Sequence, residues 1–376
     1  MTSNVLNQSS SDSRRIAGKI RFQLRWLLIG LLVPILIYIG YFFNYHLVYA
    51  GIAEEIFIQS DDIQLAGILV KPDTPGPYPA IVLLHHAGPQ RYEKWFYRIH
   101  TNVFVRQGFA VLSYDQRGSG NSEGELRTAG FPEFVNDGSA IVNFLQAQSD
   151  IIPDQIGLFG ASESGWYSPE IAAKSGNIAF IINKVGPPMP WLDTVLHEAR
   201  MDALAAGVQA KDIEDVLSLK TRIYQFYVDT AFNEGVDDGS EREEINALLT
   251  EINNRPGVEN VMIKSLPEYE AIYYKALASK ASYDPSPFLR EIDIPMLYIL
   301  AGEDVNIPFE SSVDHLERLK FELNKDITIQ MYPTAGHYLY RYNWFPMEGF
   351  YVHGYLDLIG NWASSRIDRD NQLSIE

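Results

Sequence analysis

The sequence predicts an α/β protein with a mostly parallel central sheet, helices on both faces and a helical insertion, preceded by one transmembrane helix. Two observations lead to this fold class. Short apolar runs alternate with helical stretches beyond residue 52, and such alternation is typical of a parallel sheet covered by helices. Near the N terminus, the apolar segment 26–43 contains no charged residue and is long enough to span a bilayer.

The segment 26–46 is predicted to be a transmembrane anchor. No acidic or basic residue lies between Arg25 and Glu54, and no basic residue follows Arg25 until Lys71. The leader 1–25 instead holds five basic residues against one acid. Because positive flanks stay on the cytosolic side, the leader is expected in the cytosol and the rest of the chain outside. We also expect the polar, Ser-rich N terminus to be disordered.

A cleaved signal peptide is the main alternative for this segment, since Val48-Tyr49-Ala50 resembles a small-residue cleavage site. The apolar run is longer than the core of a typical signal peptide, and the basic leader is long. These features favour an uncleaved anchor. A buried core helix is the third interpretation.

The charge of the chain restricts its partners. The formal net charge is −18, and removing the five basic residues and one acid of the leader leaves about −22. Such an acidic surface argues against nucleic acid as a partner. The sequence has no cysteine, which excludes disulfides and thiolate metal sites.

The candidate nucleophile is Ser162, within the stretch Gly160-Ala161-Ser162-Glu163-Ser164-Gly165. This stretch follows the apolar run 156–159 and precedes a predicted helix over 166–174. A strand-to-helix turn of small residues can expose a serine hydroxyl. From this stretch alone, the alternative remains a turn of small residues with no catalytic role, joining a buried strand to a helix.

A serine hydroxyl needs a base, and the base needs an orienting acid. Two predicted strands, 296–301 and 327–332, are each followed by a suitable group. Asp304 follows the first and is the candidate acid, with Glu303 as a possible substitute. His337 follows the second and is the candidate base.

The order Ser162, Asp304, His337, each after a strand, resembles that of the α/β-hydrolase superfamily. The similarity is greatest to capped bacterial esterases and serine-aminopeptidase-like enzymes, and it covers 52–365. The sequence departs from the superfamily pattern at three points, two of them in these motifs. Ser164 occupies a position usually held by glycine, and the loop from Gly302 to Asp304 is one residue short. The third is His86, in the loop after the strand 80–84. The strand 110–114 and the loop 115–122 after it also resemble the superfamily, and we assign that loop a structural role.

The resemblance implies two backbone amides that bind an oxyanion. The strand 80–84 ends in His85-His86-Ala87-Gly88-Pro89, which is similar to the superfamily's His-Gly-x-Gly-Pro loop. Ala87 would supply one amide and Glu163 the other. His86 replaces a usual glycine, and it either contributes to the substrate pocket or caps the loop.

The resemblance also divides the chain into a core, 52–185 and 291–365, and a helical cap, 186–290. Helical patterns run over 192–206, 210–231 and 241–252, with a turn at 233–240. Trp191, after the Pro-rich start of the insertion, is a candidate for the substrate pocket. The aromatic residues of the cap either line that pocket or form the cap's own core; they are Tyr224, Phe226, Tyr227, Tyr273 and Tyr274.

By this resemblance the protein is a membrane-anchored serine hydrolase that cleaves carboxylic esters through an acyl-enzyme on Ser162, without a metal or an organic cofactor. Its partners would be a small ester or short peptide substrate and the lipid bilayer. A peptidase or amidase of the serine aminopeptidase type is the first alternative. A catalytically inactive, hydrolase-like binding or scaffold protein is the second. The oligomeric state and the substrate do not follow from the sequence.

Overall fold

The computed structural model describes residues 3–233, 239–340 and 350–367. The chain divides into two compact units, Met1–Val48 and Tyr49–Glu376. The first unit consists of one helix, α1 (Ser3–Leu47). Its part Arg25–Leu47 is apolar and long enough to cross a membrane.

The N-terminal helix begins much earlier than the apolar segment. The expected disorder of the Ser-rich N terminus is wrong, because α1 starts at Ser3. No proline occurs before Pro34, so nothing in the leader stops a helix that the apolar segment can propagate.

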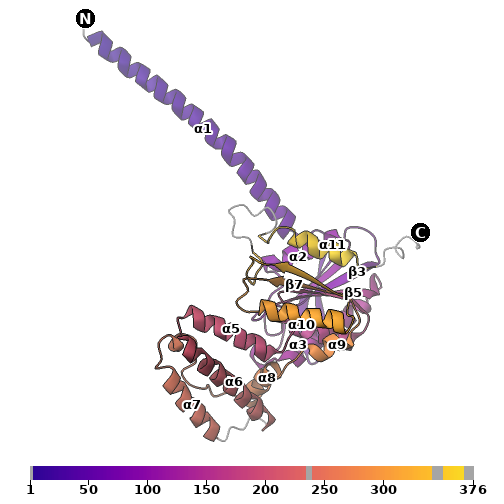
Figure 1. Cartoon of the computed structure of the whole chain (residues 1–376). Coiled ribbons are helices and arrows are strands. Elements are labelled where there is room, and N and C mark those ends of the chain that lie inside the picture. The colour runs from indigo at the N-terminus through magenta and orange to yellow at the C-terminus, as the bar shows by residue number, and fades with distance from the viewer. Residues whose placement is uncertain (1–2, 234–238, 341–349, 368–376) are drawn as a thin grey trace. The chain divides into compact units, whose positions relative to one another are not determined.

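The second unit is built on an eight-stranded sheet with the strand order β1-β2-β4-β3-β5-β6-β7-β8 (Figure 1). The strands β1 and β2 form an antiparallel pair at one edge, and β2 is also antiparallel to β4. All the other neighbours are parallel. The strands span Ile52–Ser60, Ile63–Lys71, Tyr78–Leu83, Ala110–Tyr114, Ile151–Ala161, Ile178–Lys184, Met296–Ala301 and Ile327–Tyr332.

Helices cover both faces of this sheet (Figure 1). On one face lie α2 (Trp95–Arg106) and α11 (Tyr355–Ser364), which contact each other. On the other lie α3 (Phe131–Gln146), α4 (Ser164–Ser175), α9 (Ser286–Glu291) and α10 (Phe309–Glu322). On this second face, apolar side chains of the strands pack against the four helices in one large cluster. The predicted fold class, an α/β-hydrolase fold with a mostly parallel sheet, is confirmed.

Between β6 and β7 the chain forms four further helices, gathered together in Figure 1. They are α5 (Trp191–Ala205), α6 (Ala210–Phe232), α7 (Ser240–Ile252) and α8 (Ala271–Ala281). The first three lie where helical patterns predict them, whereas α8 was not predicted. The turn predicted at 233–240 falls largely on 234–238, outside the described residues. These helices bury an apolar cluster of their own, which includes Ile223, Leu249 and Tyr274.

The loop after β4 has the structural contacts expected of it. The Asp115 carboxylate accepts backbone N–H groups from Tyr92 at 3.0 Å and Asn121 at 2.8 Å. Arg117 donates two hydrogen bonds to Asp137, at 2.8 and 2.7 Å. This bidentate, buried pair fixes the loop against α3.

Candidate active site

The three predicted reactive residues each follow a strand at the same edge of the sheet. Ser162 comes directly after β5, Asp304 follows β7, and His337 follows β8. These strands run parallel in the order β5-β6-β7-β8, so their carboxyl ends lie together. In open α/β sheets this edge is where ligands bind.

The side chains of these residues form one hydrogen-bonded chain. Ser162 Oγ lies 2.9 Å from His337 Nε2, and His337 Nδ1 lies 2.8 Å from Asp304 Oδ2. With Nδ1–H donating to the carboxylate, Nε2 is left to accept the serine proton. The structure therefore brings together a hydroxyl, an imidazole and a carboxylate in the geometry of an activated nucleophile.

Asp304 is held firmly in place. Its side chain is 2% exposed, and Oδ1 accepts the backbone N–H groups of Asn306 at 2.9 Å and Ile307 at 3.1 Å. These bonds leave Oδ2 for the imidazole. Glu303, the alternative acid, is exposed and does not take part in this chain.

The turn that carries Ser162 is strained. Ser162 has a φ of 53°, in the left-handed region that non-glycine residues rarely adopt. Its N–H donates to the carbonyl of Lys184 at 3.0 Å, which ties the turn to β6. Strain of this kind persists only where surrounding contacts enforce it, and it is typical of functional sites.

Ser164 explains how the turn departs from the usual glycine pattern. Its Oγ accepts the N–H of Ala161 at 2.6 Å and donates to the Ala161 carbonyl at 3.1 Å, so the buried hydroxyl is satisfied. The glycine that close packing requires is Gly165, where a Cβ would collide with the backbone of Gly186.

The two predicted oxyanion donors flank the nucleophile. Among the described residues, the backbone N–H groups of Ala87 and Glu163 have no acceptor in the protein. The Ala87 carbonyl accepts from Gln90 Nε2 at 2.9 Å, and Lys94 Nζ donates to Gln90 Oε1 at 3.0 Å. These two hydrogen bonds hold the loop after β3 in place and leave the Ala87 N–H available to bind an oxyanion.

The side chain of Glu163, unlike its backbone N–H, forms an ion pair. It is buried and forms an ion pair with Lys280 of α8, with 2.7 Å between Oε1 and Nζ. Lys280 also lies over the rings of Phe131 and Phe134. The pair thus links the residue after the nucleophile to the helices between β6 and β7.

A cavity of about 300 Å³ opens beside Ser162. Its described lining comes from the loops after β3, β5, β7 and β8, from the end of β6 and from α2. The lining residues are His86, Ala87, Gln90, Lys94, Phe96, Ser162, Lys184, Asn306, His337, Tyr338, Tyr340 and Tyr351. His86, the candidate pocket residue, is among them. Burial and the nearby Lys184 hold the pKa of His86 well below its ordinary value, so its ring is neutral.

Trp191 is not among the described residues that line this cavity. Its ring packs against Trp166 and Tyr224, with centroids 6.4 and 5.1 Å apart. The buried aromatic residues of the following helices, among them Phe226, Tyr227 and Tyr274, belong to the apolar cluster between those helices. A sequence pattern could not distinguish this core from a pocket.

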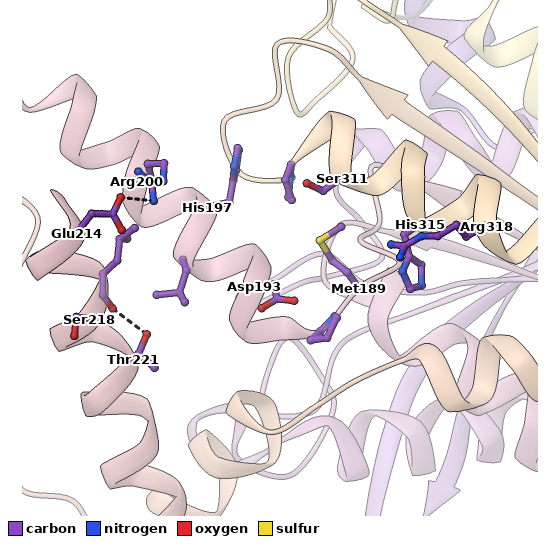
Figure 2. Close-up of a pocket in the computed structure, with 14 residues that line it drawn as sticks. Met189, Asp193, His197, Arg200, Glu214, Ser218, Thr221, Ser311, His315 and Arg318 are labelled. Carbon is purple, nitrogen blue, oxygen red and sulfur yellow. Dashed lines mark hydrogen bonds and ion pairs between the residues drawn. The ribbon is translucent and has the colours of Figure 1, made fainter. Parts of the chain in front are cut away.

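A second, wider cleft of about 690 Å³ lies between α5, α6 and α10, as Figure 2 shows. Arg200 and Glu214 pair on its α5–α6 side, and His315 and Arg318 enter from α10. Neither Ser162 nor His337 lines it. We therefore place the candidate chemistry in the smaller cavity, despite the greater volume of the cleft.

The sequence does not single out several residues of this cavity, among them Gln90 and Lys94, which brace the Ala87 loop, and Lys184. The only signal for Lys184 is a charged residue shortly after the apolar run 178–182. Among the described residues, no group of three or more His, Asp or Glu side chains is placed to hold a metal ion.

The fold and this cluster define an α/β-hydrolase of the serine hydrolase class. More closely, the chain belongs to the X-Pro dipeptidyl-peptidase (S15) family, whose model matches residues 61–331. The protein is therefore a hydrolase of the esterase and peptidase type.

Individual relatives are more distant. The quorum-quenching protein AidA of Acinetobacter baumannii is 26% identical over 44% of this chain and 55% of its own, so the chain spans about half that relative's length. The bifunctional esterase/perhydrolase DCH of Acinetobacter calcoaceticus is 26% identical over 70% of this chain and 87% of its own. The Pyrococcus furiosus esterase Pf2001 is similar in structure, with a TM-score of 0.50, 14% identity and coverage of 84% and 90%.

Proposed function

We propose that the protein is a membrane-anchored serine hydrolase that cleaves carboxylic esters through an acyl-enzyme on Ser162. The observation that carries this proposal is the unbroken hydrogen-bonded chain from Ser162 Oγ through His337 to Asp304. The relatives named as esterases support the choice of ester bonds.

The geometry supports a two-step reaction. His337 Nε2 takes the proton of Ser162 Oγ as the oxygen attacks the ester carbonyl carbon, and the carbonyl oxygen becomes an oxyanion between the amides of Ala87 and Glu163. When the intermediate collapses, His337 gives the proton to the departing alcohol and the acyl group remains on Ser162. A water molecule, deprotonated by Nε2, then attacks the acyl carbon, and the proton returns to Ser162 as the acid leaves.

The S15 family membership and one residue favour a peptidase as the second candidate. Glu198 of α5 is half-buried. Burial and the nearby Asp202 raise its pKa, whereas His337 and Lys220 act in the opposite sense. A carboxylate within electrostatic reach of His337 is suited to the free amine of a peptide.

The decisive experiment is phosphonate labelling of the detergent-solubilised full chain, with the modified peptide located by mass spectrometry. We expect modification at Ser162. The same preparation should hydrolyse a para-nitrophenyl ester faster than a dipeptidyl para-nitroanilide ending in proline. A faster amide reaction would select the peptidase, and a folded sample without labelling would select the inactive scaffold.

We also propose that α1 anchors the enzyme, with its N terminus in the cytosol and the unit after residue 48 outside. The apolar stretch Arg25–Leu47 and the basic leader before it support this topology. The protein should resist alkaline carbonate extraction, and protease added to intact spheroplasts should digest the unit after residue 48. Release of a chain that begins after Ala50 would instead reveal a cleaved signal peptide.

A further inference from the structure

Lys184 is a buried lysine directly beside the candidate nucleophile. It ends β6, and its carbonyl accepts the N–H of Ser162 at 3.0 Å. The residue is 2% exposed, and its side chain lines the cavity that also contains Ser162 and His337. Neither the proposed reaction nor the turn uses its ammonium group.

In the part of the chain that the structure describes, this ammonium group lacks the acidic partner that buried lysines normally have. Among the described residues, no carboxylate forms an ion pair with Lys184, and its contact is the ring of Tyr351, 5.4 Å from Nζ. Three other lysines whose side chains are buried or half-buried are paired with acids. They are Lys71 with Asp150, Lys280 with Glu163 and Lys325 with Asp293.

The surrounding cavity is basic within an acidic protein. Lys94 lines it from the α2 side, where Nζ donates to the carbonyl of Pro89 at 2.8 Å. No Asp or Glu belongs to its described lining, although the chain as a whole has a net charge of −18. A cavity with two lysines and no described acid is complementary to an anion.

We propose that Lys184 binds a carboxylate of the substrate, so that the preferred substrates are esters with a carboxylate near the scissile carbonyl. The ester part of this inference rests on the proposed function, whereas carboxylate binding does not. The substrate's negative charge then supplies an acidic partner that the described residues do not give Lys184. Because the ammonium group lies beside Ser162, the same contact orients the ester for attack.

The protonation of Lys184 provides an independent readout. Burial lowers its pKa to about 7, against the opposing charge of Asp304. Burial also lowers the pKa values of the neighbouring His86 and His100, so these rings are neutral where Lys184 titrates. The other titratable residues of this lining are Lys94, His337, Tyr338, Tyr340 and Tyr351. Burial lowers the pKa of Lys94 and raises that of Tyr351, which stays neutral. Carboxylate affinity should therefore be highest below pH 7 and fall as the pH rises above it.

The first test measures binding without turnover. In the full chain carrying Ser162→Ala, glutarate and its neutral diamide are titrated by calorimetry at pH 6 and pH 8. We expect glutarate to bind at least about tenfold more tightly than the diamide at pH 6, since a hydrogen bond to a charged group has this value. Adding Lys184→Met should remove the preference. Adding Lys174→Met should not, because Lys174 lies at the surface, paired with Glu170.

Equal affinity for glutarate and the diamide at pH 6 would overturn the proposal, as would an unchanged preference in the Lys184→Met variant. Lys184→Met should keep or raise the melting temperature, because it removes a buried charge that no described acid neutralises. If this variant fails to fold, the comparison of glutarate with its diamide at pH 6 and pH 8 still tests the proposal. A preference for glutarate that does not weaken from pH 6 to pH 8 would contradict it.

The second test uses turnover of para-nitrophenyl glutarate and para-nitrophenyl valerate, and of acetate esters of para-hydroxybenzoate and para-cresol. The first two esters form one pair and the last two another, and each pair contains one ester with a carboxylate. In at least one pair the ester with the carboxylate should have the higher kcat/KM, and in the Lys184→Met variant the two values should become equal. Hydrolysis without any carboxylate preference would refute the inference and leave the proposed function standing. Glutarate binding through Lys184 in a protein that neither hydrolyses esters nor reacts with phosphonate would refute the proposed function alone.

Discussion

Replacing Ser162 with alanine should reduce ester hydrolysis by roughly 10⁶-fold in kcat, because the acyl-enzyme can no longer form. The residual rate would come from binding and the amides of Ala87 and Glu163. The fold should be unaffected, since alanine keeps the N–H that donates to the Lys184 carbonyl. The rate of hydrolysis of a para-nitrophenyl ester measures the loss of activity, and the melting temperature shows whether the fold is unaffected.

Ser164→Ala is the matched control two residues away. Ser164 Oγ bonds only to the backbone of Ala161, so its loss should cost about 1 kcal/mol of stability per hydrogen bond. Turnover and phosphonate labelling should survive. An enzyme that tolerates Ser162→Ala but loses labelling in Ser164→Ala would show that the nucleophile is misassigned.

Strands with a clear apolar pattern were the most predictable part of the fold. β4, β7 and β8 lie at the predicted residues because each is a short run bounded by glycine, proline or charged residues. The sequence also predicts that Ser162, Asp304 and His337 lie close together. Each follows a strand, and parallel strands bring their carboxyl ends to one edge of the sheet. The hydrogen bonds among these side chains required the structure.

Other features depend on contacts that no local pattern contains. The spacing of small residues around Ser162 did not reveal that Gly165, rather than residue 164, meets the backbone of Gly186. A lysine after an apolar strand is typical of a solvent-exposed strand end, yet Lys184 is enclosed by loops distant in sequence. A pocket aromatic and a core aromatic have the same sequence signature, so the sequence alone does not show that Trp191 packs against Trp166 and Tyr224.

Asp304→Asn should slow ester hydrolysis by about 10⁴-fold while leaving substrate binding nearly unchanged. Asn306 and Ile307 would still donate to the amide oxygen of the new residue, as they now donate to Asp304 Oδ1. Its NH₂ group would then face His337 Nδ1 in place of Oδ2. Since NH₂ is a donor, the imidazole would carry its proton on Nε2 and could no longer accept the proton of Ser162.

Glu303→Gln is the matched control, because Glu303 is adjacent, acidic and exposed. Its side chain is outside the hydrogen-bonded chain, so kcat should stay within about twofold of the wild type, as for a surface substitution. Measuring kcat and KM separately for both variants distinguishes lost orientation from lost binding. If Glu303→Gln were the more damaging change, the orienting acid would be Glu303. The 2.8 Å contact between Asp304 and His337 would then hold the imidazole in place without activating it.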